Sequence, residues 1–316
     1  MHTMNLTMEE LAGQGPQCLL DYQPPFDWRA MLAYLATRAI PGVESVSADS
    51  YSRTIVIDGQ AGEMQVRFLQ DRHAVQLRIL SLHASYAQQI VARVREMFDL
   101  SALSAQVTHF LARDALLARA LQDSPGIRVP LAWDGFEVAV RAIIGQQVSV
   151  KGATTLVSRV AHTLGSAYVS PTGSTLDRVF PSPAMMAQAS LDGLGITTRR
   201  IAAINALATA VCDGELRFDG SMSSAEFVAQ VVKIPGIGPW TAQYIALRAL
   251  NDPDAFPHAD LILLRAAAAP GESLTPAQLL ERSQAWRPWR SYVVMLLWHD
   301  YGKQKSVAAA RERAAQ

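Results

Sequence analysis

Residues 231–250 read VVKIPGIGPWTAQYIALRAL, and this stretch decides how the second half of the chain folds. Apolar residues at helical spacing predict one helix before the glycines and another that begins at Pro239, where the missing N–H of proline does no harm. Gly236 and Gly238 allow the positive φ angles and the close backbone approach of a tight turn. We therefore predict a helix–hairpin–helix unit over residues 224–250.

This hairpin would place backbone N–H groups at the N-terminus of its second helix, which is a favourable site for a phosphate oxygen. The candidate contacts are Gly236, Ile237, Gly238 and Thr241. A plain turn between two helices explains the same residues, because two glycines near a proline are common in such turns. The hairpin alone leaves both interpretations open.

Composition limits the class of protein. The 316 residues are 50% apolar and 18% charged, which is typical of a folded globular chain. No apolar run reaches the roughly 20 residues of a membrane span, and the N-terminus lacks an export signal, so we expect a cytoplasmic protein with no membrane partner. Cys18 and Cys212 are too few for a zinc or iron–sulfur ligand set. The formal net charge of zero argues against a tight, unselective DNA coat, but it permits a local phosphate site.

The first hundred residues predict a small α+β unit. Residues 1–17 show no periodicity and are predicted to be loose, and residues 18–100 form an α+β domain with an antiparallel sheet. Alternating apolar residues predict the strands, and apolar residues at helical spacing predict the helices. The predicted strands are 54–58, 63–69 and 74–80, and the predicted helices are 27–40 and 86–100.

After residue 100 the strand pattern disappears, and residues 101–302 are predicted to be all-helical apart from a polar loop at 166–182. Asp134 is a predicted N-cap, with Glu137 three residues later completing a capping box. Residues 303–316 are predicted to be a basic tail. The predicted helices are 104–112, 114–121, 134–145, 149–164, 183–190, 198–212, 224–233, 239–250, 260–268, 276–285 and 289–301. The fold class is therefore mostly α with an N-terminal α+β domain.

Four separate segments, in order, resemble the helix–hairpin–helix DNA glycosylase superfamily, and more narrowly the bacterial 3-methyladenine DNA glycosylase II (AlkA type) family. They are QPPFDWRAMLAYLATRAIPGVE (23–44), FEVAVRAIIGQQVSV (136–150), IPGIGPWTAQYIALRAL (234–250) and WRPWRSYVVMLLWHD (286–300). The resemblance covers nearly the whole chain and implies the helix–hairpin–helix DNA glycosylase fold. It also implies a monomer that excises alkylated bases such as 3-methyladenine and 7-methylguanine from double-stranded DNA, with no required cofactor and no nucleotide cofactor.

The resemblance places the catalytic aspartate of the family at Asp260. Breaking an N-glycosidic bond develops positive charge on the sugar, and a fixed carboxylate in a water-poor cleft stabilises that charge. The carboxylate can also position or deprotonate the attacking water. Judged from the residues alone, Asp260 is better explained as an N-cap of the apolar helix that follows it, worth roughly 1 kcal/mol. The two roles are compatible.

Trp240 stands where the lyase branch of the superfamily carries a lysine that forms a Schiff base. An indole cannot be that nucleophile, so the resemblance implies base excision without strand cleavage. The chain has no cysteine after Cys212, so the iron–sulfur motif of the endonuclease III branch is missing as well.

Four aromatic residues match the base pocket of the family: Trp298, Tyr244, Trp240 and Tyr34. Alkylation at N3 or N7 makes a purine cationic, and electron-rich ring faces attract such a base through cation–π interaction. Aromatic residues at helical spacing are more often part of a core, so the alternative is that these rings are structural.

A flipped base leaves a gap in the DNA stack. Gln147 stands where the best-known family members carry a wedge leucine, and Gln146 is the neighbouring candidate. Alternatively both are polar turn residues on the surface. The resemblance also implies a structural Na⁺ or K⁺ ion at the hairpin, held by the main-chain carbonyls of Val232, Ile234 and Ile237.

Two other functions compete with this hypothesis: a glycosylase for oxidised or deaminated bases, and a non-catalytic helix–hairpin–helix DNA-binding protein. Asp260 beside an aromatic pocket argues against the second, because a pure phosphate grip gains nothing from a carboxylate that repels phosphate. A helical interaction protein leaves the hairpin glycines unexplained. Candidates for a basic cleft are Lys151, Arg199, Arg200 and Arg248.

Overall fold

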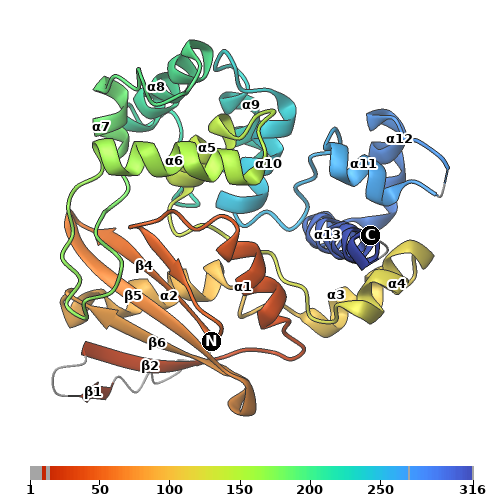
Figure 1. Cartoon of the computed structure of the whole chain (residues 1–316), viewed down its shortest axis with the longest axis horizontal. Helices are drawn as coiled ribbons and strands as arrows, with labels where there is room; N and C mark the ends of the chain where they lie inside the picture. Colours follow the sequence, from red (N-terminus) through yellow and green to blue (C-terminus); the bar gives the residue numbers. More distant parts are fainter. Residues whose placement is uncertain (1–8, 12–14, 270, 315–316) are drawn as a thin grey trace.

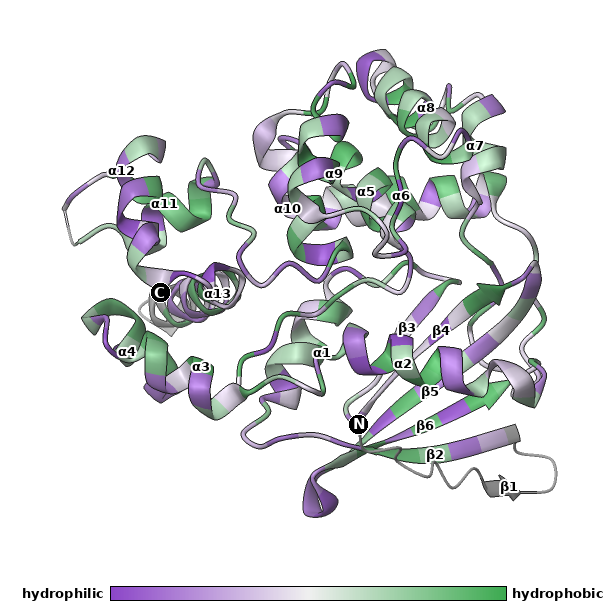
Figure 2. Cartoon of the chain, turned by 180° about the vertical axis from the view of Figure 1, so that it is seen from behind, coloured by the Kyte–Doolittle hydropathy of each residue, from purple (hydrophilic) through white to green (hydrophobic). Residues whose placement is uncertain are grey.

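The computed structural model describes residues 9–11, 15–269 and 271–314. The N-terminal unit is built on a six-stranded antiparallel sheet with the strand order β1-β2-β6-β5-β4-β3 (Figure 1). Hydrophobic and hydrophilic residues alternate along its strands, which is the pattern of a sheet that buries one face (Figure 2). The strands are β1 (Glu9–Leu11), β2 (Gly15–Asp21), β3 (Glu44–Val46), β4 (Ser50–Ile57), β5 (Gln60–Leu69) and β6 (Ala74–Leu80).

Two helices, α1 (Trp28–Ala36) and α2 (Ala87–Met97), share one hydrophobic core with the buried residues of the sheet. The three predicted strands are present. The prediction that residues 1–17 are loose is wrong for β1 and for the start of β2, which begins at Gly15 and pairs with β6 in the register Leu20↔Val75. Residues 1–8 and 12–14 of that predicted segment lie outside the described part of the chain.

The remaining helices form two lobes. Helices α5 to α10 surround one core, and α3, α4, α11, α12 and α13 contribute to another. The opposite face of α10 reaches into the second core through Ala246 and Leu247, so α10 joins the lobes. The helices are α3 (Ser104–Leu111), α4 (Ala115–Asp123), α5 (Gly135–Ile144), α6 (Val150–Leu164), α7 (Pro183–Gln188), α8 (Thr198–Cys212), α9 (Ser224–Val231), α10 (Pro239–Ala249), α11 (Leu261–Ala267), α12 (Pro276–Arg282) and α13 (Arg290–Ala314), with short 3₁₀ turns η1 (Gln70–Arg72), η2 (Ala84–Tyr86) and η3 (Ser283–Trp286).

The last helix is longer than its predicted end at residue 301, because α13 continues to Ala314. The expectation of a separate tail from residue 303 is therefore wrong. Gly302 keeps a helical backbone instead of the positive φ with which glycine usually ends a helix. The residues after it are rich in Ala, Lys, Gln and Arg, which all favour helix.

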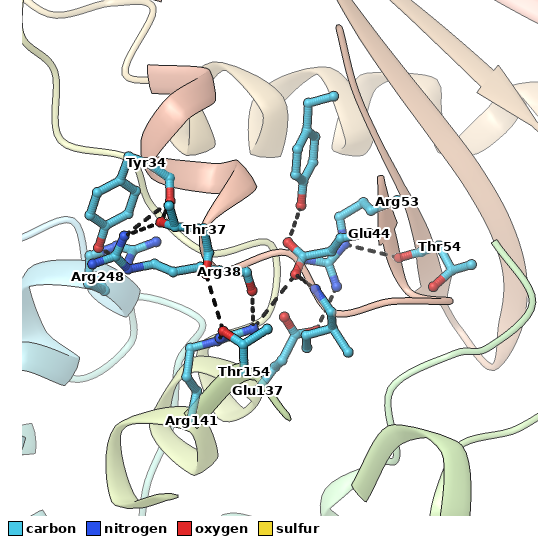
Figure 3. Close-up of polar contacts among 12 residues, drawn as sticks. Tyr34, Thr37, Arg38, Glu44, Arg53, Thr54, Glu137, Arg141, Thr154 and Arg248 are labelled. Carbon is cyan, nitrogen blue, oxygen red and sulfur yellow. Dashed lines mark hydrogen bonds and ion pairs between the residues drawn. The ribbon is translucent and has the colours of Figure 1, made fainter. Parts of the chain in front are cut away.

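Buried charged side chains join the sheet to the first helical lobe (Figure 3). Arg53 of β4 donates a 2.6 Å hydrogen bond to the carboxylate of Glu137 on α5. The carboxylate oxygens of Glu44 lie 3.9 Å from a guanidinium nitrogen of Arg53 and 3.8 Å from one of Arg141. Asp134 caps α5 as predicted, but Glu137 turns to Arg53 instead of completing a capping box. Removing one partner would leave a buried charge unpaired, so this network holds the two units in a fixed arrangement.

Candidate active site

A cleft of about 1090 Å³ opens between the two helical lobes, with one contribution from the N-terminal unit. Its walls come from the end of α5 and the turn after it, the first turns of α6, α8 and α10, the start of α11 and the middle of α13. No single unit of the fold contains the whole site. The lining residues used below are Arg38, Arg141, Gln146, Gln147, Arg199, Arg200, Gly236, Gly238, Trp240, Thr241, Tyr244, Asp260, Leu261, Trp298, Tyr301, Gly302 and Lys305.

Asp260 lies in this cleft with a fixed carboxylate. Its Oδ1 accepts the backbone N–H groups of Ile262 (2.9 Å) and Leu263 (3.0 Å), so it is the N-cap of α11. The indole N–H of Trp298 donates to the same oxygen at 3.1 Å, and that of Trp240 donates to Oδ2 at 3.0 Å. The residue is only 9% exposed. Cap and cleft placement therefore coexist, and Oδ2 keeps acceptor capacity toward the cleft.

Three aromatic rings stand beside the carboxylate. Trp240 stacks on Tyr244 with ring centroids 5.5 Å apart and an angle of 20°, and Tyr244 meets Trp298 at 6.1 Å and 41°. The rings pack on the adjoining hydrophobic cores and also line the cleft. They are therefore both core residues and pocket residues, the two alternatives that the sequence left open. Trp240 and Trp298 are half-buried, which leaves aromatic surface for a flat, electron-poor ligand.

Tyr34 does not line the cleft but lies behind Tyr244. Its hydroxyl accepts a hydrogen bond from Arg248, and the guanidinium of Arg38 lies 3.7 Å from its ring centroid. Arg248 also donates to the Tyr244 hydroxyl at 3.3 Å and is 5% exposed, so the prediction that Arg248 belongs to a basic cleft is wrong. One helical turn separates it from Tyr244, and both residues point into the same buried region.

The same arginines affect the acidity of the pocket tyrosine. Burial opposes ionisation of the Tyr244 hydroxyl, but the nearby guanidinium groups of Arg248 and Arg38 outweigh that effect and lower its pKa to about 8. Burial raises the pKa of Tyr34, which shares the Arg248 guanidinium. The two buried tyrosines therefore differ in acidity, although both hydroxyls contact the same guanidinium.

The hairpin glycines differ in their roles. Gly236 has a φ of +97°, and a Cβ there would lie 3.2 Å from the Cβ of Ala203. Gly238 has an extended backbone, so of the two glycines only Gly236 uses the positive φ that glycine allows. A Cβ at Gly238 would meet no atom within 4 Å, and Gly238 faces the cleft. Gly236 is therefore needed for the turn, whereas Gly238 leaves room for a ligand.

The other predicted hairpin contacts serve the turn itself. The Ile237 N–H donates to the Ile234 carbonyl at 3.0 Å, and the Ile237 side chain is buried. Thr241 is 3% exposed, and its hydroxyl accepts from the side-chain amide of Gln146 at 3.1 Å. Neither side chain is free to reach DNA in this arrangement.

The two wedge candidates separate clearly. The side-chain amide of Gln146 also donates a hydrogen bond to the Gly236 carbonyl at 2.9 Å, and the backbone carbonyl of Gln146 accepts one from Arg200. Gln146 therefore ties the turn after α5 to the hairpin. Gln147 is exposed, faces the cleft and has a φ of +55°, a left-handed conformation that is uncommon for a residue with a side chain. Only Gln147 of the pair is placed to project from the protein.

The basic candidates are spread over the site. Arg199 and Arg200 line the cleft, whereas Lys151 lines a neighbouring groove on α6. Sequence reasoning missed the cleft residues Arg38, Arg141, Tyr301 and Lys305. The Ala- and Lys-rich composition after Gly302 was a usable sign that the last helix continues past Tyr301.

The described residues contain neither a helix long and apolar enough to cross a membrane nor a metal-binding group of three or more His, Cys, Asp or Glu side chains. The carbonyls assigned to a monovalent cation belong to the turn between α9 and α10. Val232 is the C-cap of α9, where carbonyls lack partners inside the helix, and Ile234 accepts the Ile237 N–H. Neutral carbonyl oxygens of this kind fit Na⁺ or K⁺.

Comparison with known proteins gives the family. Residues 17–134 match the AlkA N-terminal domain. The chain is 33% identical over 297 residues to DNA-3-methyladenine glycosylase 2 of Escherichia coli, covering 92% of this chain and 99% of that protein. It is 34% identical to a probable bifunctional transcriptional activator/DNA repair enzyme AlkA of Mycobacterium tuberculosis, over 88% of this chain but 56% of that protein, so it spans little more than half of this relative.

Solved structures share the fold. A 3-methyladenine DNA glycosylase from Archaeoglobus fulgidus matches with a TM-score of 0.78 at 20% identity, covering 88% of this chain and 96% of that one. An 8-oxoguanine glycosylase/lyase of Clostridium acetobutylicum matches with a TM-score of 0.69 at 17% identity, covering 94% and 99%. With the agreement in sequence over nearly the whole length of the Escherichia coli relative, these matches lead to one conclusion: the chain belongs to the AlkA family of helix–hairpin–helix DNA glycosylases.

Proposed function

We propose that this protein hydrolyses the N-glycosidic bond of alkylated bases, including 3-methyladenine and 7-methylguanine, in duplex DNA and leaves the strand intact. The observation that carries the proposal is the Asp260 carboxylate, held by indole N–H groups on both oxygens beside the stacked ring of Tyr244. The name of the Escherichia coli relative supports the choice of substrate.

The fixed carboxylate suits the charge that the reaction creates. As the bond to the base breaks, positive charge develops on the sugar, and Asp260 stabilises it without having to reorient, because four N–H groups already hold it. Oδ2 accepts only the Trp240 hydrogen bond among these four and can therefore also orient the attacking water.

The rings account for recognition of the leaving base. An alkylated purine carries positive charge, which the accessible faces of Trp240 and Trp298 attract after the base has left the helix. Gln147 projects into the cleft and would fill the gap in the stack, where its amide can hydrogen-bond the orphaned partner base. Trp240 occupies the place of a Schiff-base lysine, so the strand is not cut.

We also propose that the hairpin holds the DNA backbone at Gly238, with a Na⁺ or K⁺ ion bound by the carbonyls of Val232, Ile234 and Ile237 supporting the turn. The open space at Gly238 and the nearby guanidinium groups of Arg199 and Arg200 support this role.

The test is to incubate the protein with a methylated duplex and to measure free base release and strand breakage separately. We expect release of 3-methyladenine, with breakage only after alkali. In Asp260→Asn, release should fall by at least about 10²–10³-fold, the cost of losing one charge-stabilising group, while binding to the duplex persists. No base release by the wild-type protein, or near-normal release by Asp260→Asn, would refute the proposal.

Asp114 offers a matched control. It caps α4 through the N–H of Leu116 (2.9 Å) and accepts the indole N–H of Trp286 (2.9 Å), but it lies outside the cleft. Asp114→Asn therefore removes comparable structural hydrogen bonds, and the folded variant should release base at the wild-type rate.

A further inference from the structure

The part of α13 that passes Trp298 forms the rim of the cleft on the side of α11. Tyr301, Gly302 and Lys305 line the cleft, and Leu261, the residue after Asp260, lines it as well with 66% of its surface exposed. The hairpin and Arg199 line another part of the cleft, on α10 and α8. The site therefore has a border on α11 and α13 that the hairpin does not supply.

Three polar side chains meet on this rim. The Lys305 ammonium lies 5.2 Å from the centroid of the Tyr301 ring, and both Lys305 and Arg265 of α11 interact with the Tyr301 hydroxyl. The nearby Arg265, followed by the charge of Lys305, lowers the pKa of Tyr301. Arg265 and Lys305 are exposed.

The two cations are not neutralised locally. Among the described residues, neither Arg265 nor Lys305 has a carboxylate oxygen within 4.0 Å. The nearest acidic residue along α13, Asp300, accepts a hydrogen bond from Gln304 at 2.7 Å. Two positive charges without a carboxylate partner, gathered beside the cleft rim, attract a polyanion.

We propose that Arg265, Tyr301 and Lys305 form a second phosphate grip, which holds the DNA backbone on the side of Asp260 away from the hairpin. A guanidinium, an ammonium and a hydroxyl together offer charge-assisted hydrogen bonds to phosphate oxygens. Leu261, between Asp260 and Arg265, provides apolar surface for the sugar. This inference rests on the proposed function, because it assigns the DNA contacts that flank the flipped nucleotide.

The same helix supplies a matched control. Lys303 is two residues from Lys305, but its ammonium donates to the carbonyl of Asp123 (2.9 Å) and to the hydroxyl of Ser124 (2.7 Å) at the end of α4. It does not line the cleft. Lys303→Ala and Lys305→Ala thus remove the same charge from the same helix, and only the second removes it from the grip.

The experiment measures the affinity for a short duplex with a stable abasic-site analogue over a range of salt concentrations. We expect Lys305→Ala and Arg265→Ala each to weaken binding several-fold at low salt and to reduce the slope of log K against log salt by about 1. Lys303→Ala should keep the wild-type slope. Unchanged slopes in both rim variants, or an equal reduction in Lys303→Ala, would overturn the proposal.

The outcome is independent of the chemical step. A wild-type protein that releases no alkylated base, but whose rim variants show the reduced slope, would refute the proposed reaction and keep the grip. If the wild-type protein excises alkylated bases but the rim variants keep the wild-type salt slope, the proposed reaction stands and the second phosphate grip is refuted. Because both side chains are exposed, thermal unfolding of the two variants should match that of the wild type, and this checks their fold.

Discussion

At the scale of single residues, Asp260 and Asp114 show that hydrogen bonding alone does not decide whether a carboxylate faces the cleft. Each caps a helix, accepts backbone N–H groups through one oxygen and accepts an indole N–H. Their sequences also look alike, with an aspartate directly before an apolar helix. The difference is that Asp260 faces the cleft and Asp114 does not, which a local pattern cannot reveal.

The indole N–H of Trp298 should matter for the rate of the chemical step. Trp298→Phe keeps an aromatic face near Tyr244 and removes the 3.1 Å hydrogen bond to Asp260. A hydrogen bond to a charged group is worth about 1.5–3 kcal/mol, so the single-turnover excision rate should fall by about 10- to 100-fold with little change in KM.

The control is Trp286→Phe, which removes the equivalent donor from Asp114 and should leave the rate per folded molecule unchanged. A loss confined to KM in Trp298→Phe would show that the indole serves stacking rather than the carboxylate.

At the scale of elements, the hairpin contains one glycine that the turn requires and one that faces the cleft. Gly238→Val places its Cβ in open space and should retain the fold, but it should weaken binding to damaged and undamaged duplex alike. Gly236→Val forces a branched side chain into a φ of +97°, at a cost of about 1–3 kcal/mol, and crowds Ala203. Thermal unfolding and duplex affinity, measured side by side, check both variants. Wild-type affinity in a folded Gly238→Val protein would mean that the hairpin is not a phosphate grip.

The sequence predicts most elements, because local chemistry decides them. Prolines, caps and apolar spacing place the hairpin and most helices within a few residues of where they lie. It misses β2 because that strand is specified by pairing with β6, far along the chain, and not by its own short pattern. Arg248 is misplaced for the same reason, since the residues that bury it come from other elements.

At the scale of the whole molecule, the cleft depends on joints between units that are distant in sequence. One is the Arg53–Glu137 ion pair between the sheet and α5. Another joint is at Asp99, which follows α2. Its carboxylate accepts a 2.8 Å hydrogen bond from the Tyr292 hydroxyl of α13, and its backbone carbonyl accepts one from the Arg128 guanidinium. These joints place Asp260 and the pocket rings relative to Arg38.

The Asp99 joint should make stability depend on pH. Burial raises the pKa of Asp99 from 3.8 to about 6, although the hydrogen bond from Tyr292 and the charge of Arg128 act in the other direction. An acid with a raised pKa in the folded state contributes stability that is complete below its unfolded pKa and is lost as the pH rises through the folded value. The loss amounts to at most about 3 kcal/mol.

The thermal stability of Asp99→Asn relative to the wild type should therefore increase as the pH rises from about 4 to about 7.5, because the amide avoids the cost of a buried charge. Thermal unfolding of both proteins at the two pH values measures this. If the melting temperatures of the two proteins differ by the same amount at both pH values, the prediction is wrong.

The four N–H groups on Asp260 also bear on which bases leave. Asp260 acts on the sugar through the charge of its fixed carboxylate, and the departing base takes the bonding electrons. A base made cationic by alkylation departs as a neutral molecule, whereas an unmodified purine would depart as an anion. Protection of undamaged DNA then lies in the intrinsic lability of the lesion more than in the shape of the cleft, and excision rates should rank with leaving-group ability.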